Sequence, residues 1–111
     1  MEIDKEVLRG YIDPIILSIL AKADSYGYDL ARQAKELSCG TFELKEGTLY
    51  VAFKRLEKNS YIVSYWQEGQ AARRKYYHIT EKGRAFLDHK KQEWQFIKQL
   101  MDTFYKGDER K

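Results

Sequence analysis

Six residues in two short segments have the types and spacing for contact with nucleic acid. One segment holds three consecutive positive charges, and the other lies within a predicted helix that exposes hydroxyl and ammonium groups. Cationic side chains bind phosphates whatever the base sequence, whereas polar groups on a helix reach base edges in the major groove. The two segments together predict a surface for double-stranded DNA. The residues are Arg73, Arg74 and Lys75 in the first segment and Thr48, Tyr50 and Lys54 in the second.

The sequence contains no catalytic or metal-binding pattern. His78 and His89 have no carboxylate or cysteine at ligand spacing, and Cys39 has no base nearby in the sequence. A glycine-rich phosphate loop and a nucleophile elbow are also absent. A single cysteine excludes an internal disulfide and a cysteine-rich zinc site, which favours a reducing compartment. We therefore expect a protein that is not an enzyme and needs no metal or cofactor.

Length and charge set the scale of the protein. The 111 residues suit one domain, and 20 basic against 17 acidic side chains leave a net charge of only +3. No apolar stretch approaches the ~20 residues that span a bilayer, and the N-terminus does not resemble a signal peptide. We expect a cytoplasmic protein without a membrane partner.

Helical periodicity accounts for the first half of the chain. A first amphipathic segment covers 6–23 and is interrupted at Asp13-Pro14, where either Asp13 caps a helix that starts at Pro14 or one longer helix kinks. A second helix is expected over 26–37, with Asp24 or Ser25 as its N-cap. Phe42 and Leu44 alternate with polar residues and suggest a very short strand. A third helix, with its apolar stripe at steps of three and four, is expected over 46–59.

The pattern then changes to a period of two, which indicates a β-hairpin. Residues 62–68 and 74–80 are rich in aromatic and β-branched side chains. The alternation places Tyr77 and Ile79 inward and Tyr76 and His78 outward. Thr80 is a suitable cap for a last helix.

Together the elements predict a mainly α fold with a small β-hairpin, an α+β winged helix-turn-helix. The DNA-binding domain is expected over 1–80, with its recognition helix over about 46–59 and its wing over about 62–79. A dimerisation helix is expected over 81–106.

The last helix carries an apolar seam that a small core cannot cover. Twenty-five helical residues extend about 38 Å, so much of the seam would remain in water in a monomer. We expect the same helix of a second subunit to cover it, with Leu8 and its neighbours near the N-terminus covering the rest. Trp94 has two interpretations, dimer packing or an aromatic wall that stacks on a small planar effector. The seam comprises Leu87, Trp94, Ile97, Met101 and Phe104.

Several motifs resemble those of PadR-type transcriptional regulators. They are Leu8-Arg9-Gly10, Tyr26-Gly27-Tyr28-Asp29-Leu30, Glu46-Gly47-Thr48-Leu49-Tyr50 with Lys54-Arg55-Leu56-Glu57, and Arg73 to Thr80 with Gly83 after it. The resemblance extends from Leu8 to about Leu100 and is to the short subfamily with one C-terminal helix, which includes multidrug-responsive repressors. It implies a homodimer that binds near-palindromic operators, usually as a repressor. Many members of the family release DNA when a small molecule binds. In the multidrug-responsive relatives, a tryptophan matching Trp94 stacks on flat aromatic ligands.

The chain departs from the family pattern at two turns. Asn59-Ser60 stands where the family usually has glycine, and we expect Asn59 to adopt the left-handed conformation that the turn requires. Gln70-Ala71-Ala72 precedes the double arginine, where the family often has glycine or proline, so the wing tip is expected to differ in conformation but not in charge.

One alternative function uses the same fold without DNA. A winged-helix module for protein–protein assembly would show an apolar or acidic face on its third helix. Here that face carries Tyr50, Lys54 and Lys58, which favours a sequence-specific DNA-binding regulator.

Overall fold

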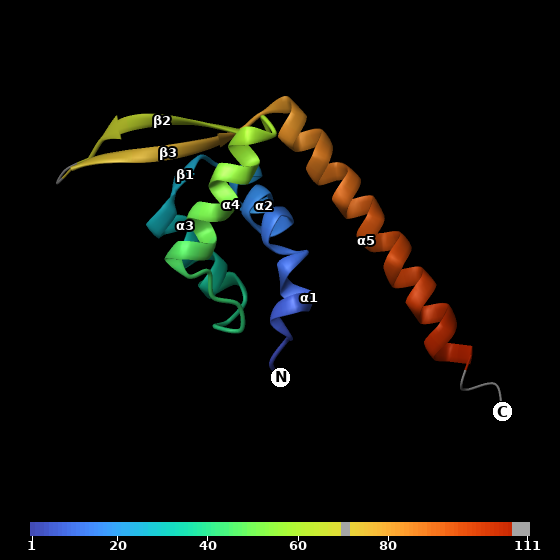
Figure 1. Cartoon of the computed structure of the whole chain (residues 1–111). Helices are drawn as coiled ribbons and strands as arrows, with labels where there is room; N and C mark the ends of the chain where they lie inside the picture. Colours follow the sequence, from blue (N-terminus) through green and yellow to red (C-terminus); the bar gives the residue numbers. More distant parts are fainter. Residues whose placement is uncertain (70–71, 108–111) are drawn as a thin grey trace.

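A computed structural model describes residues 1–69 and 72–107. These residues form five helices and three strands, and the hairpin of the last two strands precedes the last helix (Figure 1). The bounds are α1 Lys5–Arg9, α2 Ile12–Lys22, β1 Ser25–Tyr26, α3 Gly27–Leu37, α4 Glu46–Lys58, β2 Ile62–Glu68, β3 Arg73–Ile79 and α5 Glu81–Gly107. The hairpin and the third predicted helix are thus confirmed within one residue of the expected bounds. The expected departure at the wing tip concerns residues 70–71, which lie outside the described part of the chain.

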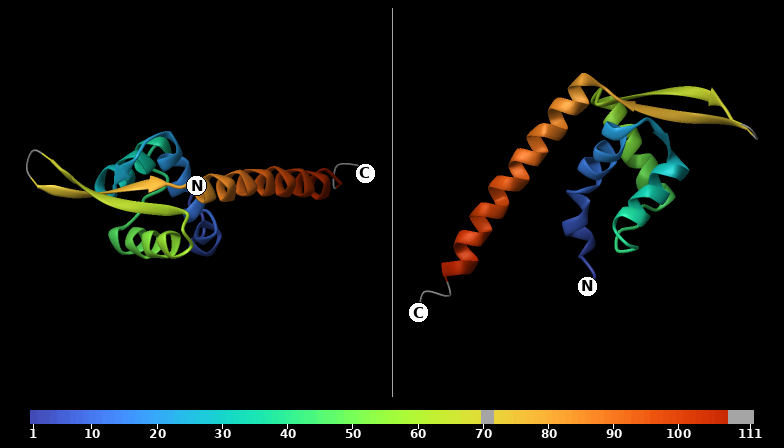
Figure 2. Two further views of the ribbon diagram at one scale, coloured as in Figure 1. Left: turned by 90° about the horizontal axis from the view of Figure 1, so that it is seen from above. Right: turned by 180° about the vertical axis from the view of Figure 1, so that it is seen from behind.

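The sheet has three antiparallel strands in the order β1-β3-β2, so β3 is central. Ile62 pairs with Ile79 at the core end of the hairpin, and Glu68 pairs with Arg73 at its far end. Side chains alternate between the two faces of a strand, and Tyr77 and Ile79 are buried as predicted while His78 is exposed. The hairpin reaches well past the helices (Figure 2), so its far end lies outside the core.

The hydrophobic core lies between α2, α3, α4 and the inner face of the sheet. Leu17 and Leu30 are fully buried, and Phe53 of α4 stacks on Tyr77 of β3 with ring centroids 3.8 Å apart. This contact fixes α4 against the hairpin, which is the relation that a recognition helix and a wing require. The buried stripe of α4 is Leu49, Ala52, Phe53 and Leu56, as its periodicity predicts.

The N-terminal segment differs from both alternatives considered for it. The chain breaks at Gly10 and Tyr11, and α2 begins at Ile12. Pro14 sits within the first turn of α2, where its missing N–H is not needed because the first four N–H groups of a helix have no partner in it. Asp13 does not act as the cap. Its carboxylate binds Arg55 of α4 instead.

Three further local predictions were wrong. Ser25 and Tyr26 form β1 rather than a helix start, and α3 has no side-chain cap. Residues 41–45 are not a strand, although Leu44 is buried. At the turn after α4, Ser60 adopts the left-handed conformation with φ 62°, while Asn59 stays at φ −87°.

The joint between the hairpin and α5 is tightly packed. The Thr80 hydroxyl accepts a hydrogen bond from the backbone N–H of Gly83 at 3.0 Å, which confirms the predicted cap, and donates one to the Ser60 carbonyl at 2.7 Å. A Cβ on Gly83 would lie 2.1 Å from the carbonyl oxygen of Tyr61, so no side chain fits there. The direction in which α5 leaves the core is therefore fixed at its first turn.

Helix α5 extends away from the rest of the molecule (Figure 1). Its 27 residues correspond to about 40 Å, and of its described residues only Gly83 and Leu87 are buried. None of the helices in residues 1–69 and 72–107 has the length and apolar character needed to cross a membrane.

Candidate DNA-binding surface

A hollow of about 530 Å³ lies where the start of α3, the exposed flank of α4 and the far half of the hairpin meet. Its walls are aromatic rings, and its rim carries the three consecutive cations of β3. The structure therefore brings Tyr50 together with Arg73, Arg74 and Lys75, which are 23 or more positions away in the sequence. The lining residues are Tyr26, Gly27, Tyr28, Tyr50, Trp66, Arg73, Arg74, Lys75 and Tyr77.

Each wing cation rests on an aromatic ring. The Arg74 guanidinium carbon lies 4.5 Å from the ring centroid of Tyr26, and that of Arg73 lies 5.0 Å from Trp66. Contacts of this kind contribute about 0.5–1 kcal/mol at exposed sites. They restrict the side chains without neutralising them, so the charges remain available to phosphates.

Tyr50 and Thr48 lie on opposite flanks of α4. Tyr50 is 49% exposed, and its ring packs edge-on against Phe53 with centroids 6.2 Å apart. Lys54, one turn further on, is exposed. Thr48 instead lines a separate hollow of about 780 Å³ together with Val51 and Arg55, so it does not join the wing cations.

An ion pair sets the orientation of α4 relative to α2. Nε of Arg55 donates to Oδ2 of Asp13 at 3.0 Å, and a second nitrogen binds the other carboxylate oxygen. The hydrogen bond to Asp13 raises the pKa of Arg55, although burial opposes the shift. Because the contact is bidentate, it restrains rotation of the helix as well as its distance.

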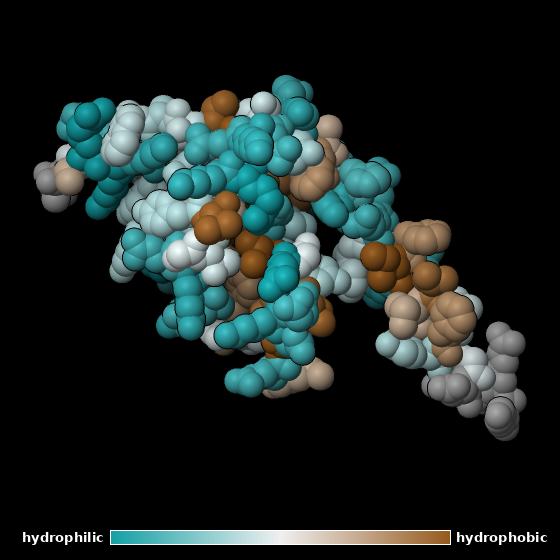
Figure 3. Space-filling view, viewed as in Figure 1, coloured by the Kyte–Doolittle hydropathy of each residue, from teal (hydrophilic) through white to brown (hydrophobic). Residues whose placement is uncertain are grey.

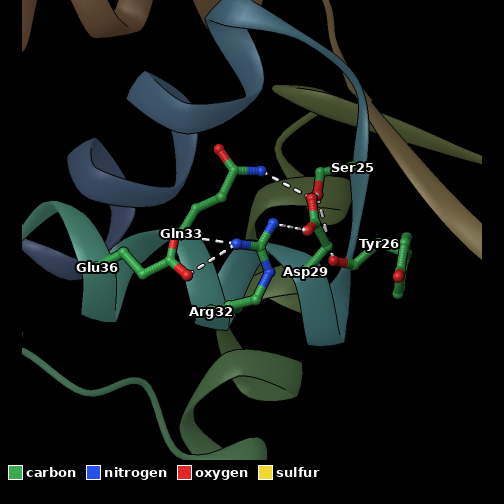
Figure 4. Close-up of polar contacts among 6 residues, drawn as sticks. All are labelled: Ser25, Tyr26, Asp29, Arg32, Gln33 and Glu36. Carbon is green, nitrogen blue, oxygen red and sulfur yellow. Dashed lines mark hydrogen bonds and ion pairs between the residues drawn. The ribbon is translucent and has the colours of Figure 1, made fainter.

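The start of α3 is held by a polar network that sequence reasoning missed (Figure 4). Asp29 accepts hydrogen bonds from the buried Ser25 hydroxyl at 3.1 Å, from Gln33 at 2.7 Å and from Arg32. In the sequence, Asp29 is marked by its helical spacing to Arg32 and Gln33 and by its place in the motif from Tyr26 to Leu30. The network joins β1 to α3 beside Tyr26 and thereby positions one wall of the hollow.

Asp29→Asn is expected to lower the free energy of unfolding by about 1–2 kcal/mol at pH 7, as for loss of a charged hydrogen bond. The Arg32 hydrogen bond lowers the pKa of Asp29; burial opposes the shift, and Gln33 and Ser25 reinforce it. A folded pKa below the unfolded value stabilises the protein above pH 4 or so, and this contribution is lost as pH falls through the folded pKa. The free energies of unfolding of the two proteins, measured with urea, should therefore approach one another as pH falls below about 4.

Glu36→Gln is the matched control for this pair of measurements. It removes the other carboxylate that binds Arg32, from a side chain 63% exposed, and should change the free energy of unfolding by less than about 0.5 kcal/mol. An Asp29→Asn deficit that does not shrink as pH falls below about 4 would show that packing, not charge, explains the effect.

The comparisons with known proteins agree with this arrangement. The family model described as "Transcriptional regulator PadR-like family" matches residues 16–89. The chain belongs to the PadR-like family. The described fold is accordingly similar to the structure of a transcriptional regulator from Clostridium thermocellum, with 43% identity, 90% of this chain and 98% of the other covered, and a TM-score of 0.84.

Two further relatives extend the match. A PadR family transcription regulator from Clostridium difficile is 49% identical, covers 86% of this chain and 99% of its own, and superposes with a TM-score of 0.77. An uncharacterized protein from Lysinibacillus sphaericus is 37% identical over 92% of this chain and 94% of its own length. This PadR-like chain is thus a DNA-binding transcriptional regulator rather than an enzyme, and its fold is the winged helix of the family.

The histidine of the PadR-like wing, His78, binds a carboxylate just after the end of α2. Nδ1 of His78 lies 2.7 Å from Asp24, whose other oxygen accepts from the Tyr65 hydroxyl at 2.7 Å. Burial raises the pKa of Asp24, but hydrogen bonds from Tyr65 and His78 and the charges of His78 and Arg84 outweigh it and lower the pKa. The hydrogen bond to Asp24 raises the pKa of Tyr65 to about 12. Across the described ranges, no cluster of three His, Cys, Asp or Glu side chains suits a metal ion.

A third hollow of this PadR-like chain lies between the start of α2 and α5. It measures about 540 Å³ and has Trp94 and Ile97 on one side and Pro14 on the other. Tyr11 meets Trp94 edge-on, with ring centroids 6.4 Å apart. Trp94 is 48% exposed, so one side of its ring remains open.

The other residues predicted for this region lie elsewhere. Leu8 lines a different, almost entirely apolar hollow of about 690 Å³ with Ile15 and Phe42. Met101 lies further along α5, beyond the residues that line the hollow at Trp94. Apolar side chains gather on this part of α5 (Figure 3). Exposed fractions between 36% and 67% are found for Phe96, Ile97, Leu100, Met101, Phe104 and Tyr105.

Proposed function

We propose that the protein is a homodimeric repressor that works in the cytoplasm on near-palindromic operators. The observation that carries this proposal is the hollow where Tyr50 of α4 meets the three wing cations. Each subunit would place α4, with Tyr50, Lys54 and Thr48, in one major groove, and Arg73, Arg74 and Lys75 on the adjoining backbone. A dimer clamped over promoter DNA excludes other proteins from it, which is the basis for repression.

The second subunit is inferred from α5. A helix whose outer half is exposed, with a row of large apolar side chains, has a strong hydrophobic reason to associate. An equivalent helix of a second copy offers the same row, and a two-fold axis makes the contact self-complementary. Residues 1–80 would then act as the reading domain and 81–106 as the dimerisation helix.

The hollow at Trp94 provides a site for a planar aromatic or hydrophobic effector. It lies between α2, which Asp13 links to α4, and α5, which would form the dimer contact. A ligand that prefers one separation of these helices would change the distance between the two α4 helices. Half-sites one turn apart, about 34 Å, tolerate only one such distance, so the ligand would alter operator affinity.

Fluorescence anisotropy is the direct test of DNA recognition. The protein is titrated into its own upstream promoter DNA and into a scrambled duplex across a salt series, while sedimentation equilibrium gives its oligomeric state. Tighter promoter binding by a dimer, with a steep salt dependence, is expected. Equal and salt-insensitive binding to both duplexes would favour the assembly module instead.

Trp94→Ala is expected to weaken binding of a planar aromatic cation such as rhodamine 6G by about tenfold, because stacking on the indole face is lost. Binding is followed by dye anisotropy in the absence of DNA. Trp66→Phe, which changes the other tryptophan far from this hollow, should leave dye affinity unchanged. If Trp94→Ala bound the dye as tightly as the unaltered protein, Trp94 would not be part of the site.

A further inference from the structure

Trp66 is an unusual residue for the far half of a hairpin. Its indole is 57% exposed, although it lines the hollow between the wing and α4. Trp66 pairs with Lys75 across the hairpin, so the two side chains share the face that is buried at Tyr77 and Ile79 nearer the core. The indole thus points to the same side of the sheet as α4 but lies beyond the core.

The indole also supports Arg73. The Arg73 guanidinium carbon lies 5.0 Å from its ring centroid, whereas the nearest Glu68 oxygen is 3.8 Å from Nε in a pair whose side chains are 62% and 82% exposed. Such an exposed ion pair contributes little and exchanges readily for a phosphate. The contact with the indole therefore remains as the feature that restrains the Arg73 side chain.

We propose that Trp66 and Arg73 act as one unit that reads the shape of the minor groove next to each half-site. The indole packs on a deoxyribose of the backbone, and the guanidinium enters the groove. This inference rests on the DNA-binding function proposed above. A narrow minor groove has a more negative potential and attracts arginine, and A·T-rich tracts have the narrowest grooves. The wing consequently favours operators with A·T-rich flanks. This preference is independent of the bases that α4 contacts.

The first test asks whether DNA covers the indole. In a Trp94→Phe chain, Trp66 is the only tryptophan, and its emission and its quenching by acrylamide are measured with and without a 30-base-pair duplex. We expect acrylamide quenching to fall at least twofold when the duplex is saturating. Unchanged quenching while anisotropy reports binding overturns the inference and leaves the proposed function intact.

A labelled version of the unaltered chain covers the case in which Trp94→Phe is poorly folded. 5-Fluorotryptophan gives one fluorine resonance for each tryptophan, and Trp66→Phe assigns them. DNA should shift the Trp66 resonance more than that of Trp94, and the reverse result would contradict the proposal. A chain that binds no duplex at all would contradict the proposed function as well.

The second test concerns specificity. Duplexes with identical half-sites and either A·T or G·C flanks are compared, and a preference of about fivefold for A·T is expected. Trp66→Ala should remove most of it, and so should Arg73→Lys, which keeps the charge but not the planar guanidinium. Val63→Ala, at an exposed position on the opposite face of the same strand, is the matched control and should keep it. Retention of the full preference by Trp66→Ala would refute shape reading by this unit.

Discussion

Replacing Arg73 and Arg74 together with alanine is expected to weaken binding to any duplex DNA by about 100-fold at low salt. Adjacent residues of a strand point to opposite faces, so Arg73 lies over Trp66 and Arg74 over Tyr26. The two guanidinium groups can thus reach backbones on two sides of a groove. Phosphate contacts supply affinity without base specificity, so promoter and scrambled duplexes should both lose affinity. Duplexes with A·T-rich flanks should in addition lose the preference of about fivefold proposed for Arg73.

Salt dependence provides the quantitative check. Each phosphate contact contributes about −0.9 to the slope of log affinity against log salt, so four lost contacts in a dimer should reduce the slope by about 3–4. Lys22→Ala with Lys35→Ala removes the same charge from exposed positions in the last turns of α2 and α3. This control should change the slope by less than about 1. A double-arginine variant with an unchanged slope would show that the wing does not contact phosphates.

The elements that sequence reasoning predicted well are those whose signal is local. The apolar stripe of α4 and the alternation of Tyr77 and Ile79 follow from periods of 3.6 and two residues, and both are confirmed. The Thr80 cap needs only the three residues after it. These elements contain all six residues predicted to contact DNA, so the sequence places each of them on a helix or strand that the structure confirms, while their contact with DNA remains a prediction.

The features that were missed depend on partners distant in the sequence. Strand β1 has two residues and exists because Ser25 and Tyr26 pair with Tyr77 and Tyr76 of β3. Asp13 resembles a helix cap until Arg55, 42 positions later, is seen to bind it. The periodicity of one segment cannot predict its contacts with a segment distant in the sequence.

Sequence patterns also could not show which of the predicted site residues share a surface. Thr48 and Tyr50 are two positions apart, yet the core side of α4 separates them into different hollows. Leu8 and Trp94 were expected to cover one seam, but Leu8 faces Ile15 and Phe42. The angles at which α1 and α5 leave the core decide this. For α5 the angle depends on the close packing of Gly83 on the Tyr61 carbonyl, which sequence patterns do not report.

Met101→Glu with Phe104→Glu is expected to raise the dissociation constant of the dimer by at least about 100-fold, because each interface would then bury four carboxylates. Both side chains are exposed in the single subunit, at 36% and 67%, so the change does not disturb its core. Thermal unfolding of the monomer should be unaltered. Sedimentation equilibrium gives the dissociation constant, and anisotropy should show the loss of promoter affinity that follows when two half-sites are no longer bound together.

Gln92→Glu with Gln99→Glu is the matched control. These exposed residues lie on the opposite side of α5 at 100° per residue and introduce the same two negative charges. A dimer that survives in the control but not in the Met101 and Phe104 variant would assign the interface to the apolar row rather than to the net charge of the helix. A dimer that survives both would place the interface elsewhere, and the apolar hollow beside Leu8 would become the next surface to test.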